Sequence, residues 1–347
     1  MQTILITGGS GYIGSHTLLE LARTGQYKLV VFDNLKNGHI EAIEIVRKNT
    51  NADIELIPGD LLDKQAIMDV CAQHKPEAVI HFAALIEAGV SMEYPTRFYE
   101  NNVTGSINLI QAMQVNGIRK LVFSSTAAVY GTPETTLVDE TSIRRPENSY
   151  AWSKFTVENL LMALATEHTA RSEQIDSVIL RYFNAAGGNP EQLIGQDYPK
   201  PTHLITVAIE AAMGKREKLT IFGDDYPTPD GSCIRDYIHV EDLARAHTAA
   251  LGYLEGFQGC DIINVGTGIG STNLEVVKLL EKIHGQFNWE IGPRRPGDPS
   301  GYVANNAKAK AVLGWEAKYT LADTLEHSYK WQKRYPKGYA SLTNNDN

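Results

Sequence analysis

The sequence has few cysteines and no long apolar run. Its three cysteines, Cys71, Cys233 and Cys260, are scattered over 347 residues, with neither a metal-binding spacing nor an even framework. We therefore expect no metal site, and a reducing, cytoplasmic compartment. No apolar stretch approaches the roughly 18 residues that would span a bilayer. Met1 and Gln2 lead directly into an apolar segment, so we also expect no signal peptide.

Positive charge is also scarce. There are 32 Lys and Arg against 41 Asp and Glu, which gives a formal net charge of −9. This balance argues against nucleic acid or an anionic membrane as a partner. A few local arginines can still bind a small anionic substrate. The length and the hydrophobic fraction of 43% are typical of a folded enzyme with one large domain or two fused lobes.

Short apolar segments alternate with amphipathic stretches through the first half of the chain. The apolar segments are continuous, which indicates strands buried on both faces of a sheet. Strands that alternate with helices predict an α/β fold with a doubly wound, Rossmann-like parallel sheet. The expected strands cover residues 3–7, 29–33, 54–58, 78–83, 120–125 and 177–184, and the expected helices cover residues 12–23, 64–73, 95–114 and 150–167.

The pattern changes after Asn184. Residues 185–190 form a loop signal, and an irregular polar stretch follows up to Pro201. Further strands are expected at residues 218–222 and 261–265. We therefore expect a first domain over residues 1–184 and a smaller, mainly substrate-binding lobe over residues 185–347. Residues 236–265 are expected to return to the first domain.

Glycines follow the first expected strand directly. Residues 8–14 read Gly-Gly-Ser-Gly-Tyr-Ile-Gly and lead into the next helix. Such glycines permit a tight turn and a close approach of the backbone to a pyrophosphate, which the helix N-terminus attracts. The second strand ends in Asp33, 19 residues after Gly14. A carboxylate there accepts the adenosine ribose hydroxyls and disfavours the extra phosphate of NADP. The sequence therefore predicts an NAD-binding domain.

Two more strand ends lie where the cofactor would pass. Asp60 follows the third strand and is placed to accept the adenine amino group, and small residues follow the fourth strand. Each segment alone could be an ordinary turn, but the carboxyl ends of strands are the ligand-binding edge of such sheets. The cofactor-binding residues expected from these segments are Gly8, Gly11, Tyr12, Ile13, Gly14, Asp33, Asn34, Asp60, Leu61, Phe82, Ala83 and Ala84.

A tyrosine and a lysine lie one helical turn apart at the start of the expected helix 150–167. Tyr150 and Lys154 share a helix face, and an ammonium near a phenol stabilises the phenolate. The tyrosine can then act as a general base near neutral pH, which an ordinary tyrosine cannot. A hydroxyl partner is expected at residues 123–126, Phe-Ser-Ser-Thr. For the pair alone, a chance Tyr and Lys on an amphipathic helix remains an alternative.

With these motifs the chain resembles the extended short-chain dehydrogenase/reductase family. Residues 181–184, 221–226, 235–240 and 293–298 resemble the UDP-glucose 4-epimerases in particular, and the similarity covers about residues 1–335. The resemblance implies a homodimeric isomerase of galactose metabolism with tightly bound NAD. It also implies 4-epimerisation of UDP-galactose and UDP-glucose through a transient 4-keto sugar.

The resemblance assigns further residues. Tyr150, Lys154 and Thr126 would be catalytic. Asn101, Ser124 and Phe183 would contact NAD together with Tyr150 and Lys154. The residues that would hold the UDP-sugar are Thr126, Tyr150, Asn184, Leu204, Phe222, Arg235, Arg295, Asp298 and Tyr302. Arginine suits a diphosphate because its donors form a planar fork, and a bulky Tyr302 implies a preference for sugars without an N-acetyl group.

Three departures from the resemblance stand out. Thr126 replaces the usual serine, Ile86 replaces a lysine near the cofactor, and the loop over residues 191–201 differs. The nearest alternative function is a nucleotide-sugar 4,6-dehydratase, but Ala127 and Ala128 stand where such enzymes carry an Asp-Glu pair. A non-catalytic NAD-binding regulator is the other alternative, although such proteins usually lose the tyrosine or the lysine.

Overall fold

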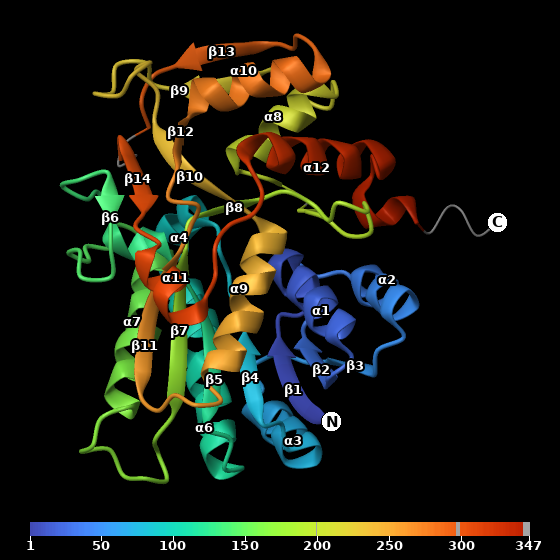
Figure 1. Ribbon diagram of the computed structural model, residues 1–347, viewed down its shortest axis with the longest axis vertical. Helices are drawn as coiled ribbons and strands as arrows, with labels where there is room; N and C mark the ends of the chain where they lie inside the picture. Colours follow the sequence, from blue (N-terminus) through green and yellow to red (C-terminus); the bar gives the residue numbers. More distant parts are fainter. Residues whose placement is uncertain (199, 296–298, 343–347) are drawn as a thin grey trace.

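A seven-stranded parallel sheet forms the larger part of the molecule. The structure is a computed structural model that describes residues 1–198, 200–295 and 299–342. The strand order is β11-β7-β5-β4-β1-β2-β3, and every neighbouring pair is parallel. The strands are β1 (Gln2–Thr7), β2 (Tyr27–Asp33), β3 (Ile54–Pro58), β4 (Ala78–His81), β5 (Lys120–Thr126), β7 (Asp176–Tyr182) and β11 (Cys260–Val265). The predicted doubly wound α/β fold is confirmed (Figure 1).

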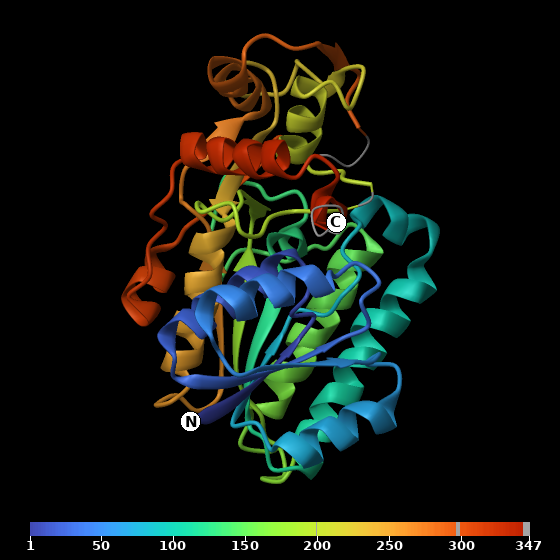
Figure 2. The same cartoon turned by 90° about the vertical axis from the view of Figure 1, so that its right-hand side faces the viewer.

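Helices cover both faces of this sheet (Figure 2). Alternate strand residues point to opposite faces, so Ile4 and Ile6 pack into one hydrophobic layer and Leu5 into the other. The first layer is covered by α1 (Tyr12–Thr24), α2 (Ile40–Thr50) and α9 (Val240–Tyr253), and the second by α3 (Lys64–His74), α6 (Gly105–Val115) and α7 (Ser149–Leu164). In the described part of the chain, no helix combines the length and the apolar character needed to cross a membrane.

The expected helix over residues 95–114 is an irregular helical segment. It follows α4 (Ala88–Glu93), begins as α5 (Pro95–Tyr99) and passes through a π-helical turn, η1 (Glu100–Thr104), into α6. Asn102 lies in this turn and is 2% exposed. Its side-chain amide accepts a hydrogen bond from Leu85 N at 2.8 Å and donates to Leu85 O at 3.0 Å and to Ser153 Oγ at 2.9 Å. The π turn thus ties this segment to two other parts of the chain.

Two expected strands end earlier than predicted. The strand over residues 78–83 ends at His81, because Phe82 N–H and Ala83 N–H both donate to Thr7 O, at 2.9 and 3.1 Å. The strand over residues 177–184 ends at Tyr182, and Asn184 already belongs to a second sheet. Both breaks direct the chain across the carboxyl edge of the large sheet, where α/β proteins bind ligands.

The second sheet belongs to a smaller lobe beyond this edge (Figure 1). Its order is β12-β10-β14-β6, with β8 beside β10, and only β12 runs antiparallel to its neighbour. These strands are β6 (Leu137–Val138), β8 (Asn184–Ala186), β10 (Ile234–His239), β12 (Gly270–Thr272) and β14 (Gly301–Ala304). A separate parallel pair, β9 (Leu219–Phe222) and β13 (Trp289–Gly292), packs with α8 (Leu204–Ala212), α10 (Asn273–His284) and α12 (Leu321–Arg334). The other short elements are η2 (Ala127–Tyr130), α11 (Ala307–Leu313) and η3 (Gly338–Ser341).

The chain passes between the large sheet and the smaller lobe more than once. After β10, which pairs inside the second sheet, α9 packs on α1, and β11 then adds an edge to the large sheet. Residues 236–265 were expected to return to the first domain. Residues 236–239 lie in β10, which belongs to the second sheet, and the later residues include α9 and β11. The domain boundary at residue 184 stays a prediction.

A buried ion pair connects α7 to the large sheet. Glu158 of α7 and Arg181 of β7 are both 0% exposed. Arg181 Nε donates to Glu158 Oε1 at 3.0 Å, and Arg181 Nη2 donates to Glu158 Oε2 at 2.6 Å. Ser125 Oγ of β5 donates to the same carboxylate, and Arg181 Nη1 donates to Tyr130 OH at 3.0 Å. The pair is therefore satisfied from several elements, as a buried pair must be.

We predict that Glu158→Gln destabilises the protein by about 3–5 kcal/mol, because it leaves the Arg181 charge buried without its partner. Urea unfolding of the purified variant measures this loss. The matched control is Glu44→Gln, which breaks the exposed pair between Glu44 and Arg47 and should cost about 1 kcal/mol or less. Equal effects of the two substitutions would contradict the structural importance of the buried pair.

Candidate active site

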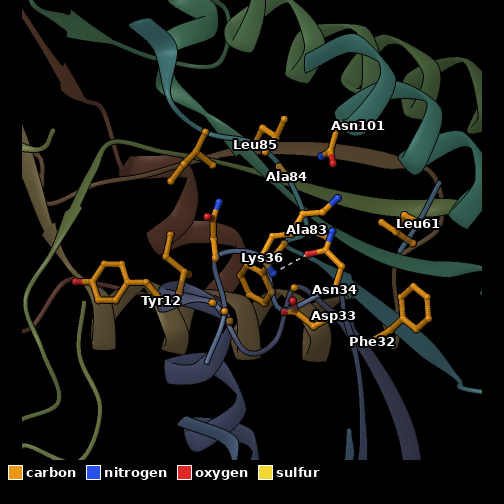
Figure 3. Close-up of a pocket in the computed structure, with 18 of the residues that line it drawn as sticks. Tyr12, Phe32, Asp33, Asn34, Lys36, Leu61, Ala83, Ala84, Leu85 and Asn101 are labelled. Carbon is orange, nitrogen blue, oxygen red and sulfur yellow. Dashed lines mark hydrogen bonds between the residues drawn. The ribbon is translucent and has the colours of Figure 1, made fainter. Parts of the chain in front are cut away.

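The glycine-rich loop joins β1 to α1 at the carboxyl edge of the large sheet (Figure 3). Gly8 has a positive φ of 74°, and a Cβ at this position would lie 2.5 Å from Ala83 N. A Cβ at Gly14 would lie 2.2 Å from Gly8 O. Neither position can carry a side chain, so the start of α1 packs directly against the loop. This is the local geometry that brings a backbone close to a pyrophosphate.

A pocket opens beside this loop. Among the residues expected to bind the cofactor, its lining contains Gly8, Gly11, Tyr12, Ile13, Gly14, Asp33, Asn34, Asp60, Leu61, Phe82, Ala83, Ala84 and Asn101. Segments from four strand ends, β1, β2, β3 and β4, therefore meet around one cavity (Figure 3). The lining also contains residues that were not expected: Lys36, Asn37, Gly38, Leu85, Tyr182 and Tyr198. Ile86, at the position where the resemblance implied a lysine, lines the pocket as well.

The two carboxylates of the pocket have different partners. Asp33 is 7% exposed and accepts only backbone N–H groups, from Ser10 at 3.1 Å and Leu35 at 2.9 Å, among the bonds of the described residues. Asp60 accepts hydrogen bonds from Lys36 Nζ and Asn34 Nδ2, both at 3.0 Å. Burial would raise the pKa of Asp60, but these bonds and the backbone N–H of residue 62 outweigh it and lower the pKa. Asp60 is therefore an anion held by protein donors.

Tyr150, Lys154 and Thr126 come together at the end of β5. Tyr150 lies in the first turn of α7, and its phenol is near enough to the Thr126 hydroxyl for that group to lower its pKa. Lys154 is 4% exposed and donates from Nζ to Ser124 O at 2.9 Å. The Ser124 hydroxyl is in turn hydrogen-bonded to His247 Nε2 at 2.9 Å. The structure thus brings the predicted tyrosine, lysine and hydroxyl into one group, and adds a buried histidine that the sequence did not indicate.

Burial controls the protonation of this group. It raises the pKa of Tyr150 to about 12, although the Thr126 hydroxyl opposes the shift, and Tyr302 and Glu87 raise the pKa further. Burial also lowers the pKa of Lys154 to about 7. The nearby Glu158 carboxylate opposes this shift, because it favours the charged ammonium. In the protein alone the phenol is therefore neutral. The expected phenolate needs an additional positive charge beside it.

The residues expected to hold a substrate come mostly from the smaller lobe. The guanidinium of Arg235, on β10, lies 5.4 Å from the centre of the Tyr302 ring, and Tyr302 packs on Phe183 with ring centres 5.7 Å apart. In the same way, Arg295 lies 3.8 Å from the centre of the Phe222 ring. Because Tyr302 also acts on the pKa of Tyr150, this side of the lobe faces the tyrosine.

The remaining expected substrate residues are less closely defined. Asn184 Oδ1 is buried and has no hydrogen-bond partner among the described residues. Leu204 begins α8 and packs against the hydrophobic cluster of the smaller lobe, and Asp298 lies outside the described residues. Over the ranges that the structure describes, no group of three or more His, Cys, Asp or Glu residues is placed to hold a metal ion.

Comparison with known proteins gives the family. The model of the NAD dependent epimerase/dehydratase family matches residues 4–266. The chain is 45% identical to UDP-glucose 4-epimerase of Bacillus subtilis over 343 residues, which are 98% of this chain and 99% of that protein. A crystal structure of UDP-glucose 4-epimerase from Bifidobacterium longum in complex with NAD+ and UDP superposes with a TM-score of 0.91 at 36% identity, over 97% of this chain and 100% of that chain.

A second solved structure agrees with the first. UDP-glucose-4-epimerase from Stenotrophomonas maltophila, with bound NAD and formylated UDP-arabinopyranose, matches with a TM-score of 0.92 at 36% identity, over 97% of this chain and 99% of that chain. The likeness therefore spans both the large sheet and the smaller lobe. On this evidence the chain belongs to the NAD-dependent epimerase/dehydratase family.

Proposed function

We propose that the protein is an NAD-dependent UDP-glucose 4-epimerase, an isomerase of galactose metabolism that interconverts UDP-galactose and UDP-glucose. The observation that carries the proposal is that Tyr150, Lys154 and Thr126 come together at the end of β5, next to Tyr182, which lines the pocket built on the glycine-rich loop. The family match and the 45% identity to a UDP-glucose 4-epimerase confirm the activity predicted from the sequence. The roles of individual residues below are part of the proposal.

The pocket fits NAD. Gly8 and Gly14 carry no side chain, which leaves room for a pyrophosphate next to the backbone of the loop. The Asp33 carboxylate has spare acceptor capacity for ribose hydroxyls and would repel the extra phosphate of NADP. NAD, when bound, supplies the acceptor and donor of the hydride at the sugar C4. The residues that would hold it are Gly8, Gly11, Tyr12, Ile13, Gly14, Asp33, Asn34, Asp60, Leu61, Phe82, Ala83, Ala84, Asn101, Ser124, Tyr150, Lys154 and Phe183.

Tyr150 acts as the general base. It takes the proton of the sugar 4-hydroxyl, and Thr126 shares that hydrogen bond. After the 4-keto sugar has rotated within the site, Tyr150 returns the proton. The Lys154 ammonium, held by Ser124 O at 2.9 Å, stabilises the phenolate that this transfer requires. Arg235 and Arg295 hold the diphosphate while the sugar moves.

The two alternative functions lack support in the site. A 4,6-dehydratase needs an extra acid and base beside Thr126, but Ala127 and Ala128 follow it, and Ala127 is 2% exposed. A non-catalytic NAD-binding regulator would not need the tyrosine, the lysine and the hydroxyl in one group, yet the structure assembles all three. A cytoplasmic location is also part of the proposal, since the scattered cysteines predict a reducing compartment.

The activity is tested by incubating the purified protein with UDP-galactose and measuring UDP-glucose. We expect conversion without consumption of NAD in wild type. Tyr150→Phe should retain NAD but lose about 10²–10⁴-fold in turnover, because only the phenol oxygen is removed. Tyr253→Phe, which removes a hydroxyl far from the pocket, is the matched control and should leave turnover unchanged. Turnover of Tyr150→Phe within about tenfold of wild type would exclude the general-base role.

The proposal includes a homodimer. Helices α4, α5 and α7 lie side by side, and they expose large apolar residues to solvent: Met92 is 61% exposed, Trp152 is 44% exposed, and Tyr94 between α4 and α5 is 56% exposed. A cluster of this kind on neighbouring helices is typical of a protein interface. Its equivalent on a second copy would complete a four-helix bundle from the segments 95–114 and 150–167 of each chain.

The interface is tested by light scattering at micromolar protein. Wild type should have the mass of a dimer, and the double substitution Tyr94→Asp with Trp152→Asp should give monomers, because it places charges in a buried interface. Ile269→Asp is the matched control, since Ile269 is 71% exposed on the smaller lobe, and this variant should stay dimeric. A monomeric wild type would refute the dimer.

Substrate size is expected to depend on Tyr302. Its ring packs on Phe183 and on the Arg235 guanidinium, and it is near enough to Tyr150 to raise the pKa of that phenol. A sugar that reacts at Tyr150 would therefore rotate beside it. An N-acetyl group on C2 would sweep into this ring, and a close-packed aromatic cannot yield without cost. We therefore predict a strong preference of kcat/KM for UDP-galactose over UDP-N-acetylgalactosamine, and a smaller preference in Tyr302→Ser. Comparable kcat/KM for both sugars in wild type would show that Tyr302 does not select between them.

A further inference from the structure

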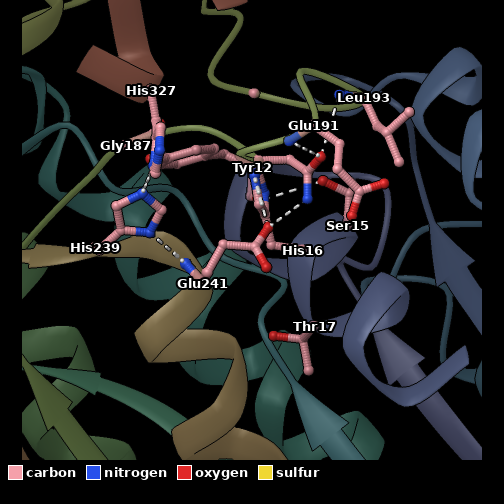
Figure 4. A network of polar contacts seen from close by, with 12 residues as sticks. Tyr12, Ser15, His16, Thr17, Gly187, Glu191, Leu193, His239, Glu241 and His327 are labelled. Atoms are coloured by element: carbon pink, nitrogen blue, oxygen red, sulfur yellow. Dashed lines mark hydrogen bonds and ion pairs between the residues drawn. The ribbon is translucent and has the colours of Figure 1, made fainter. Parts of the chain in front are cut away.

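The segment over residues 189–198 leads to Tyr198, which lines the dinucleotide pocket, and is here named the strap. Its first part is fixed in the interior by Asn189, which is 0% exposed. Asn189 Oδ1 accepts hydrogen bonds from Glu191 N at 3.1 Å and Leu193 N at 3.2 Å, and Asn189 Nδ2 donates to Glu241 Oε1 at 3.0 Å. The three partners Glu191, Leu193 and Glu241 are labelled in Figure 4. Ile194 is 0% exposed and packs into the core. The strap thus starts from a rigid base.

The far end of the strap is anchored to two other parts of the chain. Asp197 Oδ2 accepts a hydrogen bond from Tyr339 N at 2.8 Å, and Asp197 O accepts one from His39 Nε2 at 3.0 Å. The Tyr339 hydroxyl accepts from Gly195 N at 3.2 Å and lies 3.3 Å from Gly195 O. At Gly338, which has a φ of 59°, a Cβ would lie 2.0 Å from the Asp197 carboxylate. Chain segments about 140 residues apart therefore meet at Asp197.

These anchors adjoin the wall of the pocket. His39 directly follows residues 36–38, which line the pocket, and His39 N donates to Ser10 O of the glycine-rich loop at 3.0 Å. Tyr198 follows Asp197 and lines the pocket itself. Its ring lies 6.5 Å from that of Tyr12, edge to face. The strap, the glycine-rich loop and the segment after β2 therefore form one connected wall.

We propose that the strap retains the bound dinucleotide, that Tyr198 is the strap residue in contact with it, and that the anchors at Asp197 and Tyr339 set its rate of release. The inference rests on NAD as the cofactor under the proposed function. A dinucleotide enclosed by this wall leaves only when the wall opens locally, and each anchor bond adds to the free energy of that opening. Removing an anchor should therefore speed release without touching the residues that carry out the reaction.

The test is the release of radiolabelled NAD from the holoenzyme during a chase with excess unlabelled NAD. Tyr339→Phe removes only the hydroxyl that binds Gly195, and we expect release about three- to tenfold faster, the effect of one hydrogen bond. Asp197→Ala removes the acceptor of Tyr339 N–H and should speed release at least as much. The matched controls are Tyr329→Phe on α12 and Asp69→Ala, an exposed residue of α3, and both should release NAD within about twofold of wild type.

The outcomes separate the two proposals. A wild-type protein that binds no NAD would overturn the proposed function. A wild-type protein that retains NAD, with release unchanged in Tyr339→Phe and Asp197→Ala, would overturn the strap alone. Urea unfolding of each variant without NAD identifies a general loss of stability, and lowered stability with unchanged release also contradicts the strap. If Asp197→Ala does not fold, Tyr339→Phe decides, because it removes a single oxygen atom.

Discussion

The buried ion pair between Glu158 and Arg181 is the constraint on which the site depends. Tyr150, Lys154 and Glu158 are spaced by four residues and so share one face of α7. Because Glu158 is fixed to Arg181 of β7 and to Ser125 of β5, this face must point at the ends of those strands. The same carboxylate opposes the lowering of the Lys154 pKa that burial causes. One anion therefore orients the helix and favours the charged form of its lysine.

The site lies between the two lobes because the chain crosses between them at the carboxyl edge of the large sheet. β7 ends at Tyr182, which lines the dinucleotide pocket, and two residues later Asn184 already pairs in the second sheet. A second crossing follows β10, where Arg235 lies in the smaller lobe and α9 returns to the large sheet. At the first crossing, a residue of the dinucleotide pocket, Tyr182, and an expected substrate residue, Asn184, are thus only two positions apart in the sequence, which fixes their relative position.

Much of the fold and of the dinucleotide pocket could be predicted because the signals are local. Buried parallel strands give continuous apolar runs, and the glycines and Asp33 lie at fixed distances from them. Tyr198 could not be found in this way, because it reaches the pocket from a loop without periodicity that only tertiary contacts place. Helix α2 was not predicted. Its buried residues are only Ala42, Ile43 and Val46, which are too few to give a strong helical pattern.

The protonation of the site was the least predictable feature, and it connects retention of the cofactor with reactivity. Sequence spacing predicts a phenolate stabilised by lysine, but burial raises the pKa of Tyr150 to about 12 and lowers that of Lys154 to about 7. Both shifts favour the neutral forms, since burial penalises charge. When NAD is bound, the positive charge of its nicotinamide would act in the opposite direction on Tyr150. Without the cofactor the phenol is therefore neutral, and the phenolate that the proposed mechanism requires would form with the dinucleotide bound. Under the proposed mechanism, the hydride that NAD accepts is returned to the same sugar, so the cofactor must stay bound through many turnovers. The anchors proposed for residues 189–198 would serve this requirement.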